Sequence, residues 1–200
     1  MNLKEIKKLV TISEKNSKMG AVANISLPPK ITCNPKAPCT NGDCYALNGS
    51  FCYPSVQGAY AKNLNTFKTS PGAYFNAIDN WIGIKKPSIF RFHVSGDIPN
   101  KRYLNTTLDL AASNPKIKFL AFTKWYKHLE NLNEPENLSI VASAWTGFKM
   151  PKHDYPIAWL NDGVETRIPK DAIECHGNCE TCGMCWSLKK IGKDVYFNKH

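Results

Sequence analysis

No long hydrophobic run occurs anywhere in the sequence. The first eight residues are mostly polar and basic, and no apolar segment follows them. A membrane-spanning helix needs about 20 consecutive apolar residues, and a signal peptide needs an apolar stretch of about 7–15. We therefore expect neither of these segments. The sequence predicts a protein of the reducing cytoplasm that has no membrane partner.

Long basic runs are also missing, although the formal net charge is +10. No run of Lys and Arg is longer than two residues, and no nucleic-acid-binding motif is present. A solvated surface with an excess of Lys explains this charge better than a nucleic-acid partner does. Binding to nucleic acid remains the alternative interpretation.

Internal repeats, low-complexity stretches and linkers are absent as well. A chain of 200 residues with 42% hydrophobic and 21% charged residues is typical of one globular domain. We expect a single domain over residues 1–200. Its α/β core should span residues 21–170 and include a cysteine-rich loop at 33–52, and residues 171–200 should form a C-terminal cap.

Cysteine is absent from the middle of the chain. All 8 cysteines fall in two groups. The N-terminal group is Cys33, Cys39, Cys44 and Cys52, and the C-terminal group is Cys175, Cys179, Cys182 and Cys185. In a reducing compartment, cysteines at this density indicate metal binding before they indicate disulfides.

The C-terminal group has three, two and two residues between successive cysteines. Cysteines separated by two residues wrap a short loop around one cubane in bacterial-type ferredoxins. Structural zinc sites more often use two cysteine pairs with a longer spacer between them. The spacing therefore favours a [4Fe–4S] cluster held by all four cysteines, with zinc as the alternative metal.

The N-terminal group has longer spacings of five, four and seven residues. Three thiolates would leave one iron of a [4Fe–4S] cluster without a protein ligand, and a substrate or cofactor can bind such an open iron. Cys52 is either the fourth ligand or a separate thiol. The sequence also leaves open a single cluster that takes ligands from both groups.

Strand and helix patterns alternate along the chain. Strands are expected at 21–27, 88–95, 116–123, 138–144 and 156–160, and helices at 57–67, 71–84 and 101–113, with a turn or short helix at 125–129. This order predicts an α/β fold with parallel strands. A complete eight-stranded barrel typically needs about 250 residues. We therefore expect a partial (β/α) barrel or an open, mostly parallel sheet.

Polar side chains lie toward the carboxyl ends of the expected strands, where α/β sheets bind ligands. Strict alternation over residues 88–95 predicts Arg91, His93 and Ser95 on one face of the strand, with Asp97 just beyond it. Lys124 follows the next strand. We expect these side chains to line a substrate pocket in which His93 or Lys124 carries a proton. Alternatively, His93 is a hydrogen-bonded core residue, and Arg91 and Asp97 form a structural ion pair.

Several motifs together resemble one known family. They are Ser26-Leu27-Pro28-Pro29, Cys44-Tyr45-Ala46, residues 53–63, 90–97, 119–124 and 141–145, and the ending 175–186 with 192–197. From about residue 20 onward, the chain resembles the phage and prophage "gene product eighty-eight" proteins. The resemblance implies an iron–sulfur protein of the host cytoplasm with a fold like a compact radical-SAM barrel. Because Cys52 is not a regular feature of that family, the resemblance favours three N-terminal ligands.

The resemblance also implies a cofactor site. Radical-SAM enzymes bind the methionine amino group of S-adenosylmethionine at a small-small-acid turn after the second strand, and Ser95-Gly96-Asp97 is similar to that turn. Those enzymes separate their first cysteines by three and then two residues. In this chain that spacing occurs at Cys175, Cys179 and Cys182 instead.

The expected function is an iron–sulfur enzyme with one or two [4Fe–4S] clusters. It would act on a small-molecule substrate or on S-adenosylmethionine, with a protein as its electron donor. Two alternatives are a metal-stabilised module that binds nucleic acid without catalysis and a small electron carrier.

Overall fold

A computed structural model describes residues 1–16, 19–42, 44–150 and 154–199. Its centre is an eight-stranded sheet with the strand order β1-β2-β3-β4-β5-β6-β8-β7. The strands are β1 (Ile12–Ser13), β2 (Ala23–Ile25), β3 (Ile89–Phe92), β4 (Lys118–Thr123), β5 (Leu138–Ser143), β6 (Ile157–Asn161), β7 (Ile173–Glu174) and β8 (Val195–Asn198). Among the strands of the described residues, β1 pairs antiparallel with β2, and the other neighbouring strands pair parallel. The sheet does not close into a barrel, which confirms an open, mostly parallel sheet.

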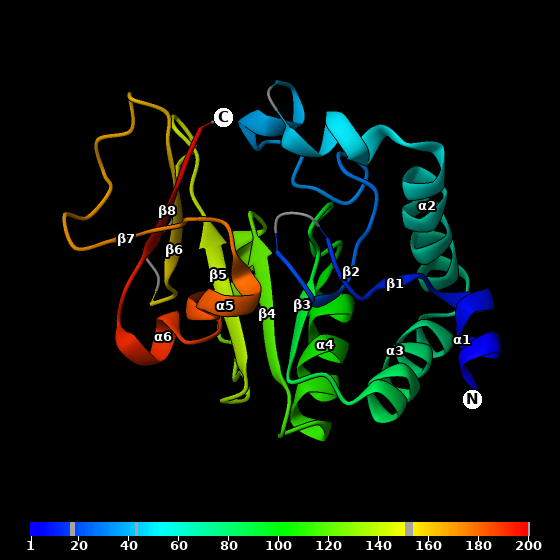
Figure 1. Cartoon of the computed structure of the whole chain (residues 1–200). Helices are drawn as coiled ribbons and strands as arrows, with labels where there is room; N and C mark the ends of the chain where they lie inside the picture. Colours follow the sequence, from blue (N-terminus) through cyan, green and yellow to red (C-terminus); the bar gives the residue numbers. More distant parts are fainter. Residues whose placement is uncertain (17–18, 43, 151–153, 200) are drawn as a thin grey trace.

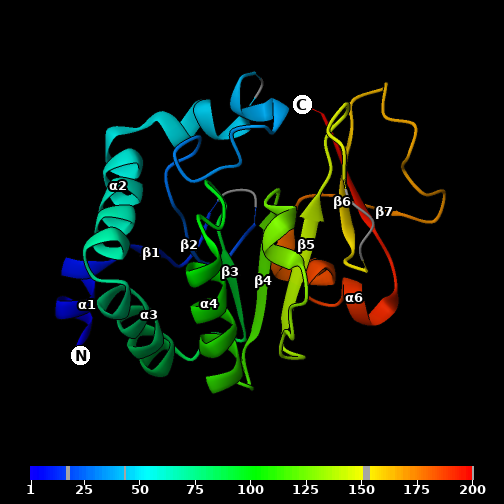
Figure 2. The same ribbon diagram turned by 180° about the vertical axis from the view of Figure 1, so that it is seen from behind.

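Four longer helices cover one face of this sheet (Figures 1 and 2). They are α1 (Leu3–Leu9), α2 (Pro54–Thr69), α3 (Pro71–Lys85) and α4 (Lys101–Ser113). The larger hydrophobic core lies between them and the sheet, and it includes Phe90, Phe92 and Phe119, which are fully buried. No described helix is long and apolar enough to cross a membrane.

Side chains and prolines set where these helices begin. The Ser70 hydroxyl accepts a hydrogen bond from the Ala73 N–H, and Pro71 occupies the first position of α3. The Asn100 side chain caps α4 in the same way. These capping signals are local, so α3 and α4 match their expected ranges closely.

The C-terminal segment covers part of the opposite face of the sheet. It contains α5 (Cys179–Cys182), the short 3-10 helix η5 (Met184–Trp186) and α6 (Leu188–Ile191). A second hydrophobic core lies beneath it, with Leu120 and Val141 from the sheet and Trp186 and Leu188 from the segment. The expected cap over 171–200 is therefore partly sheet, because β7 and β8 flank the helical turns.

The expected alternation over residues 88–95 is wrong after Phe92. His93 adopts a left-handed backbone conformation with φ of 60°, and this ends β3. Arg91 stays on the face of the C-terminal segment, but the His93 ring contacts Tyr103 of α4 on the other face. Val94 takes the place expected for His93 and packs against the second core. A single left-handed residue moves the side chains that follow it to the opposite face of the sheet. The sequence still alternates between apolar and polar residues, so the pattern does not reveal the change.

Candidate functional site

The N-terminal cysteine loop lies over the carboxyl ends of the parallel strands (Figure 1). It follows β2 and contains three short 3-10 helices, Pro38–Thr40, Tyr45–Leu47 and Gly49–Cys52. Hydrogen bonds attach it to the strand ends. The Asn34 amide donates to the Lys124 carbonyl at 3.0 Å, and the Tyr45 hydroxyl donates to the Val94 carbonyl at 2.5 Å. The loop is therefore held where parallel sheets bind ligands.

Asp97 acts electrostatically on two thiols of this loop, Cys33 and Cys39. Burial, together with the charges of Asp97, Cys39 and Cys44, raises the pKa of Cys33 to about 12. Burial also raises the pKa of Cys39, while Lys124 lowers it. The Cys33 and Cys39 thiols are therefore protonated in the absence of a metal, so a metal that binds them must displace protons. Cys52 differs from them, because it is exposed and its thiol donates to the Leu47 carbonyl.

Asp97 joins the ends of β3 and β4. Its Oδ1 accepts from the Ile98 N–H at 2.7 Å, and its Oδ2 accepts from the Lys124 N–H at 2.9 Å. Burial raises its pKa to about 6, and these hydrogen bonds partly oppose the rise. No ion pair between Asp97 and Arg91 occurs, although the structure describes both residues. The structural ion pair considered from the sequence is therefore wrong.

Gly96 is the tightest point of the turn before Asp97. Its φ is +80°, and a Cβ here would lie 2.6 Å from the Leu27 carbonyl oxygen and 2.7 Å from Thr32 Oγ1. Only glycine fits this position, because both the backbone conformation and the neighbouring atoms exclude a side chain. Ser95, one residue earlier, is 1% exposed, and its hydroxyl has no partner among the described residues.

His93 is a buried histidine at the same strand end, 3% exposed. Its Nε2 lies 3.0 Å from the Tyr103 hydroxyl, and that hydroxyl lies 2.9 Å from the Tyr74 hydroxyl. Burial, together with the charge of Arg91, lowers the pKa of His93 to about 3. The imidazole is therefore neutral. Its Nδ1 has no partner within the described part of the chain.

Arg91 lies on the face of the sheet that carries the C-terminal segment. Its guanidinium carbon is 4.7 Å from the centre of the Phe122 ring, and Nη1 is 3.2 Å from the Met19 sulfur. Its Nε is buried and has no partner in the described chain. Burial raises the pKa values of Tyr45 in the N-terminal loop and Cys185 in the C-terminal group to about 12, and the positive charge of Arg91 opposes both rises. This cation therefore lies within electrostatic reach of both cysteine groups.

The C-terminal cysteine group belongs to the second core rather than to the strand ends. Cys175, Cys179 and Cys185 pack against this core. Burial raises the pKa of Cys185 to about 12, and the charges of Cys175, Cys179 and Cys182 contribute. Two hydrogen bonds to the sheet hold the segment, from Ser139 Oγ to the Cys185 carbonyl at 2.8 Å and from Trp186 Nε1 to the Phe90 carbonyl at 3.3 Å.

The donor sets fit a soft metal in chemistry and number. The structure describes all eight cysteines, and none of them forms a disulfide. Cys39 and Cys44 act electrostatically on Cys33, and Cys175, Cys179 and Cys182 act on Cys185. Yet no three His, Cys, Asp or Glu side chains in the described ranges are already arranged around a common metal position. Metal binding therefore requires the thiols of each group to move closer together.

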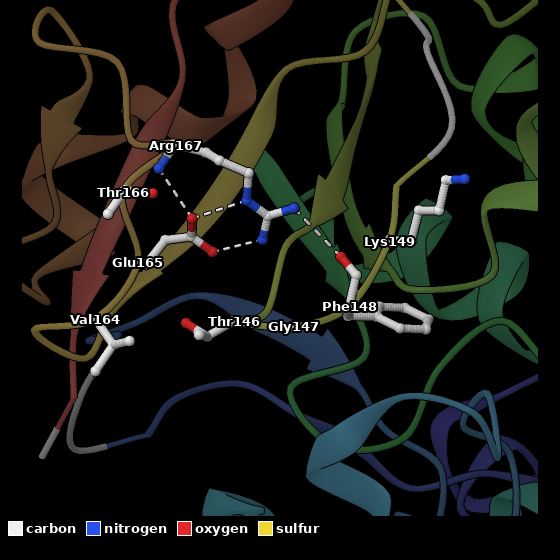
Figure 3. A pocket seen from close by; sticks show the side chains of 8 residues that line it. All are labelled: Thr146, Gly147, Phe148, Lys149, Val164, Glu165, Thr166 and Arg167. Atoms are coloured by element: carbon white, nitrogen blue, oxygen red, sulfur yellow. Dashed lines mark hydrogen bonds and ion pairs between the residues drawn. The ribbon is translucent and has the colours of Figure 1, made fainter.

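A cavity of about 390 Å³ lies at the carboxyl ends of β5 and β6 (Figure 3). Its lining is Thr146, Gly147, Phe148, Lys149, Val164, Glu165, Thr166 and Arg167. Nearby, Lys124 Nζ lies 5.4 Å from the centre of the Trp145 ring. The cavity therefore opens on the same edge of the sheet as the N-terminal cysteine loop.

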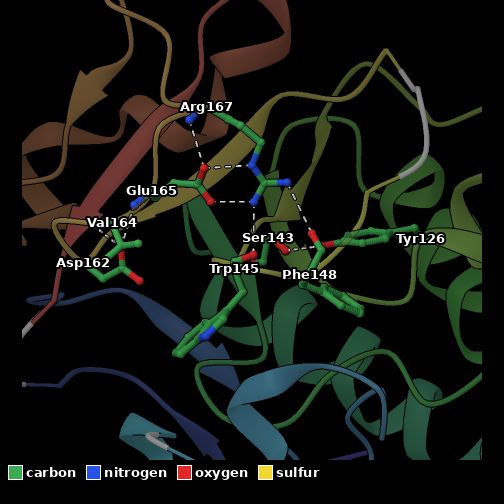
Figure 4. Close-up of polar contacts among 8 residues, drawn as sticks. All are labelled: Tyr126, Ser143, Trp145, Phe148, Asp162, Val164, Glu165 and Arg167. Atoms are coloured by element: carbon green, nitrogen blue, oxygen red, sulfur yellow. Dashed lines mark hydrogen bonds and ion pairs between the residues drawn. The ribbon is translucent and has the colours of Figure 1, made fainter.

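Arg167 organises this cavity (Figure 4). Its guanidinium forms a bidentate ion pair with Glu165, with contacts of 2.8 and 2.5 Å, and also donates to the Trp145 and Phe148 carbonyls at 3.2 and 3.4 Å. Asp162 accepts from the Val164 and Glu165 N–H groups. The loops after β5 and β6 are thus joined by one arginine. Sequence analysis missed Glu165 and Arg167, although their spacing of two residues in a polar loop was a readable signal.

These features define an α/β protein with an open parallel sheet, one thiol group at the strand ends and another on the sheet face. The chain belongs to the Gene product 88 family, whose sequence profile matches residues 1–153. This agrees with the resemblance to a phage-type family. The match includes the N-terminal cysteine group and ends before the C-terminal one. No curated protein and no solved structure matches the chain.

Proposed function

We propose that the protein is an iron–sulfur enzyme whose N-terminal loop holds a [4Fe–4S] cluster at the mouth of the open sheet. The observation that carries this proposal is that Cys33, Cys39 and Cys44 lie on one loop that is hydrogen bonded to the strand ends, where Asp97 acts electrostatically on Cys33 and Cys39. This edge is where open α/β sheets bind ligands. Three thiolates would leave one iron open, and when bound the cluster supplies a Lewis acid or an electron donor for a substrate there.

The protein's own residues would bind and orient that substrate. Asp97 fixes the turn that carries Gly96, and its carboxylate accepts from the Ile98 and Lys124 N–H groups and from the Thr123 hydroxyl, which leaves one lone-pair position for a ligand. Ser95-Gly96-Asp97 follows β3, the second parallel strand of the sheet. This supports S-adenosylmethionine as a candidate ligand, with Asp97 accepting from its amino group. Lys124 and Arg91 supply positive charge toward a negatively charged substrate.

The C-terminal cysteine group would hold a second metal with a mainly structural role. Its thiols pack against the second core, and its backbone is hydrogen bonded to β3 and β5. A metal there would attach the segment to the sheet and add folding free energy. Both a [4Fe–4S] cluster and zinc suit four thiolates at this spacing.

Iron and sulfide analysis of anaerobically purified protein tests the proposal directly. We expect about four irons and four sulfides for each N-terminal site, and an electron paramagnetic resonance spectrum of the reduced protein that changes on adding S-adenosylmethionine or substrate. A colourless protein with zinc and no iron would contradict the proposal. Binding to DNA or RNA that falls steeply with salt would instead favour the non-catalytic binding module.

A further inference from the structure

The chain of buried hydroxyls behind His93 fixes which ring nitrogen carries the proton. Tyr74 and Tyr103 are both 0% exposed, and their hydroxyls lie 2.9 Å apart. The Tyr103 hydroxyl also lies 3.0 Å from His93 Nε2. Each hydroxyl has one hydrogen to donate, so the direction of the chain determines the tautomer.

Two directions are open, and they differ in how many buried groups stay without a partner. If Tyr74 donates to Tyr103, then Tyr103 donates to Nε2 of His93. Only the Nδ1–H of His93 is then left without an acceptor. If the chain runs the other way, both the Tyr74 hydrogen and the Nδ1 lone pair are left over. A buried donor or acceptor without a partner costs stability, so the first direction is favoured.

His93, which carries the unpaired Nδ1–H, lies at the edge of the sheet that carries the N-terminal cysteine loop. His93 directly follows β3, and its backbone N–H donates to the Ile25 carbonyl at the end of β2. Its left-handed conformation is uncommon for a residue other than glycine, and such positions cluster at functional sites. Ser95 Oγ, two residues later, is a second buried polar atom without a partner in the described chain. Native structures leave few such atoms unpaired.

The charge nearby indicates what kind of acceptor fits. Arg91 lies two residues before His93, its Nε is buried without a partner in the described chain, and no carboxylate within the described ranges forms an ion pair with it. A negatively charged oxygen would accept from Nδ1–H and offset this positive charge.

We propose that His93 presents an Nδ1–H donor to a carboxylate oxygen of the substrate, and that Tyr103 is the positioning residue that holds this tautomer. The carboxylate part of the proposal depends on the function proposed above, because the ligand would be the substrate of that site. The tautomer part does not depend on any metal. Under this assignment His93 is a binding residue and does not accept a proton from the substrate.

Nuclear magnetic resonance of protein labelled with ¹⁵N-histidine tests the tautomer. The His93 signal is identified by its loss in His93→Asn, since Asn tolerates the left-handed conformation. We expect Nδ1 to be protonated and Nε2 to be unprotonated in the wild type. Tyr103→Phe removes the donor to Nε2 and should mix the two tautomers. Tyr74→Phe, the matched control, deletes an equally buried hydroxyl and should leave the wild-type tautomer in place.

Protonation at Nε2 in the wild type, or equal effects of the two tyrosine substitutions, would overturn the tautomer assignment. Sodium acetate tests the ligand class, with sodium chloride at equal ionic strength as its control. A saturable shift of the His93 Nδ1–H signal with acetate, weakened in Arg91→Gln, is the expected result. No shift with acetate would overturn the carboxylate assignment. A protein without iron that gives the expected tautomer would refute the proposed cluster and leave the tautomer assignment standing.

Discussion

The Asp97 carboxylate accepts the backbone N–H of Lys124 at 2.9 Å, and this contact joins the end of β3 to the end of β4. The other oxygen of the same carboxylate accepts from the Ile98 N–H. One side chain thereby holds the turn at Gly96 and the start of the segment after β4. The placement of the ends of β3 and β4 beneath the N-terminal cysteine loop therefore depends on Asp97.

Asp97→Asn tests this role. An amide has one acceptor oxygen, so one of the two backbone N–H groups loses its partner while it stays buried. We expect the free energy of unfolding to fall by about 1–3 kcal/mol, measured by urea denaturation at neutral pH. Asp109→Asn changes the same functional group on the exposed side of α4 and should stay within about 0.5 kcal/mol of the wild type. Equal effects of the two substitutions would contradict the role of Asp97.

Gly96→Ala tests the tight turn, with Gly163→Ala as the control. Both glycines have a φ near +80°, but only Gly96 has atoms within 4 Å of an added Cβ. The control should lose about 1–2 kcal/mol from backbone strain alone. Gly96→Ala should lose clearly more, because the Cβ overlaps the Leu27 carbonyl. Thermal unfolding of both variants measures the difference, and similar losses would show that the Gly96 turn relaxes freely.

Single substitutions should show that three of the N-terminal cysteines bind the metal and that Cys52 does not. We expect Cys33→Ala, Cys39→Ala and Cys44→Ala each to abolish or strongly reduce iron at the N-terminal site. Cys52→Ala should retain it, since Cys52 is exposed and already donates to the Leu47 carbonyl. Iron and sulfide counts on proteins purified side by side provide the measurement. Loss of iron in Cys52→Ala equal to that in Cys33→Ala would make Cys52 a fourth ligand and close the site.

Cys182 distinguishes a metal-bound C-terminal segment from a metal-free one. Cys182 is exposed, so without a metal Cys182→Ala should change stability by no more than about 0.5 kcal/mol. With a metal bound to all four cysteines, the same substitution removes a ligand and should cost more than about 2 kcal/mol. Cys185→Ala is destabilising in both cases because Cys185 packs against the second core. Thermal unfolding with and without a chelator gives the comparison.

The Glu165–Arg167 pair predicts a stability change in acid. The ion pair and hydrogen bonds with Arg167 hold the pKa of Glu165 below its ordinary value of 4.5. A depressed carboxylate pKa contributes stability that is complete above the unfolded value and is lost as the pH falls through the folded value. The effect should be about 1 kcal/mol or less, because the Arg167 side chain is 41% exposed.

Glu165→Gln removes this titration. The difference in urea midpoint between wild type and Glu165→Gln should therefore be largest near neutral pH and shrink as the pH falls below 4.5. Glu130→Gln, at an exposed position, should show no such dependence. A difference for Glu165→Gln that stays constant with pH would mean that shape, rather than charge, holds the loops together.

Local signals predicted the helices and most of the sheet. The expected helix at 101–113 coincides with α4, and the one at 71–84 differs from α3 by one residue at its end. Capping residues and the period of apolar side chains are properties of neighbouring positions, so they can be read directly. In contrast, β1, β7 and β8 were not predicted. They are two to four residues long and gain their stability from pairing with distant strands.

The sequence predicted which residues belong to the site, but it did not predict how their side chains are arranged in space. The cysteine loop and Asp97 meet at one edge of the sheet, as parallel strands require. His93 lies on the opposite face from the one expected, where its ring contacts Tyr103 of α4. The alternation rule assumes an extended backbone, and the left-handed residue that broke it is specified by contacts across the fold.

The sequence by itself determined the element types, the parallel order and the two concentrations of thiols, because periodicity, capping and spacing depend only on residues close in the chain. The tertiary structure alone decided which thiols meet Asp97, which face His93 occupies and how Arg167 joins two loops. Those relationships connect residues separated by up to tens of positions, and packing and burial, which no local pattern encodes, select them.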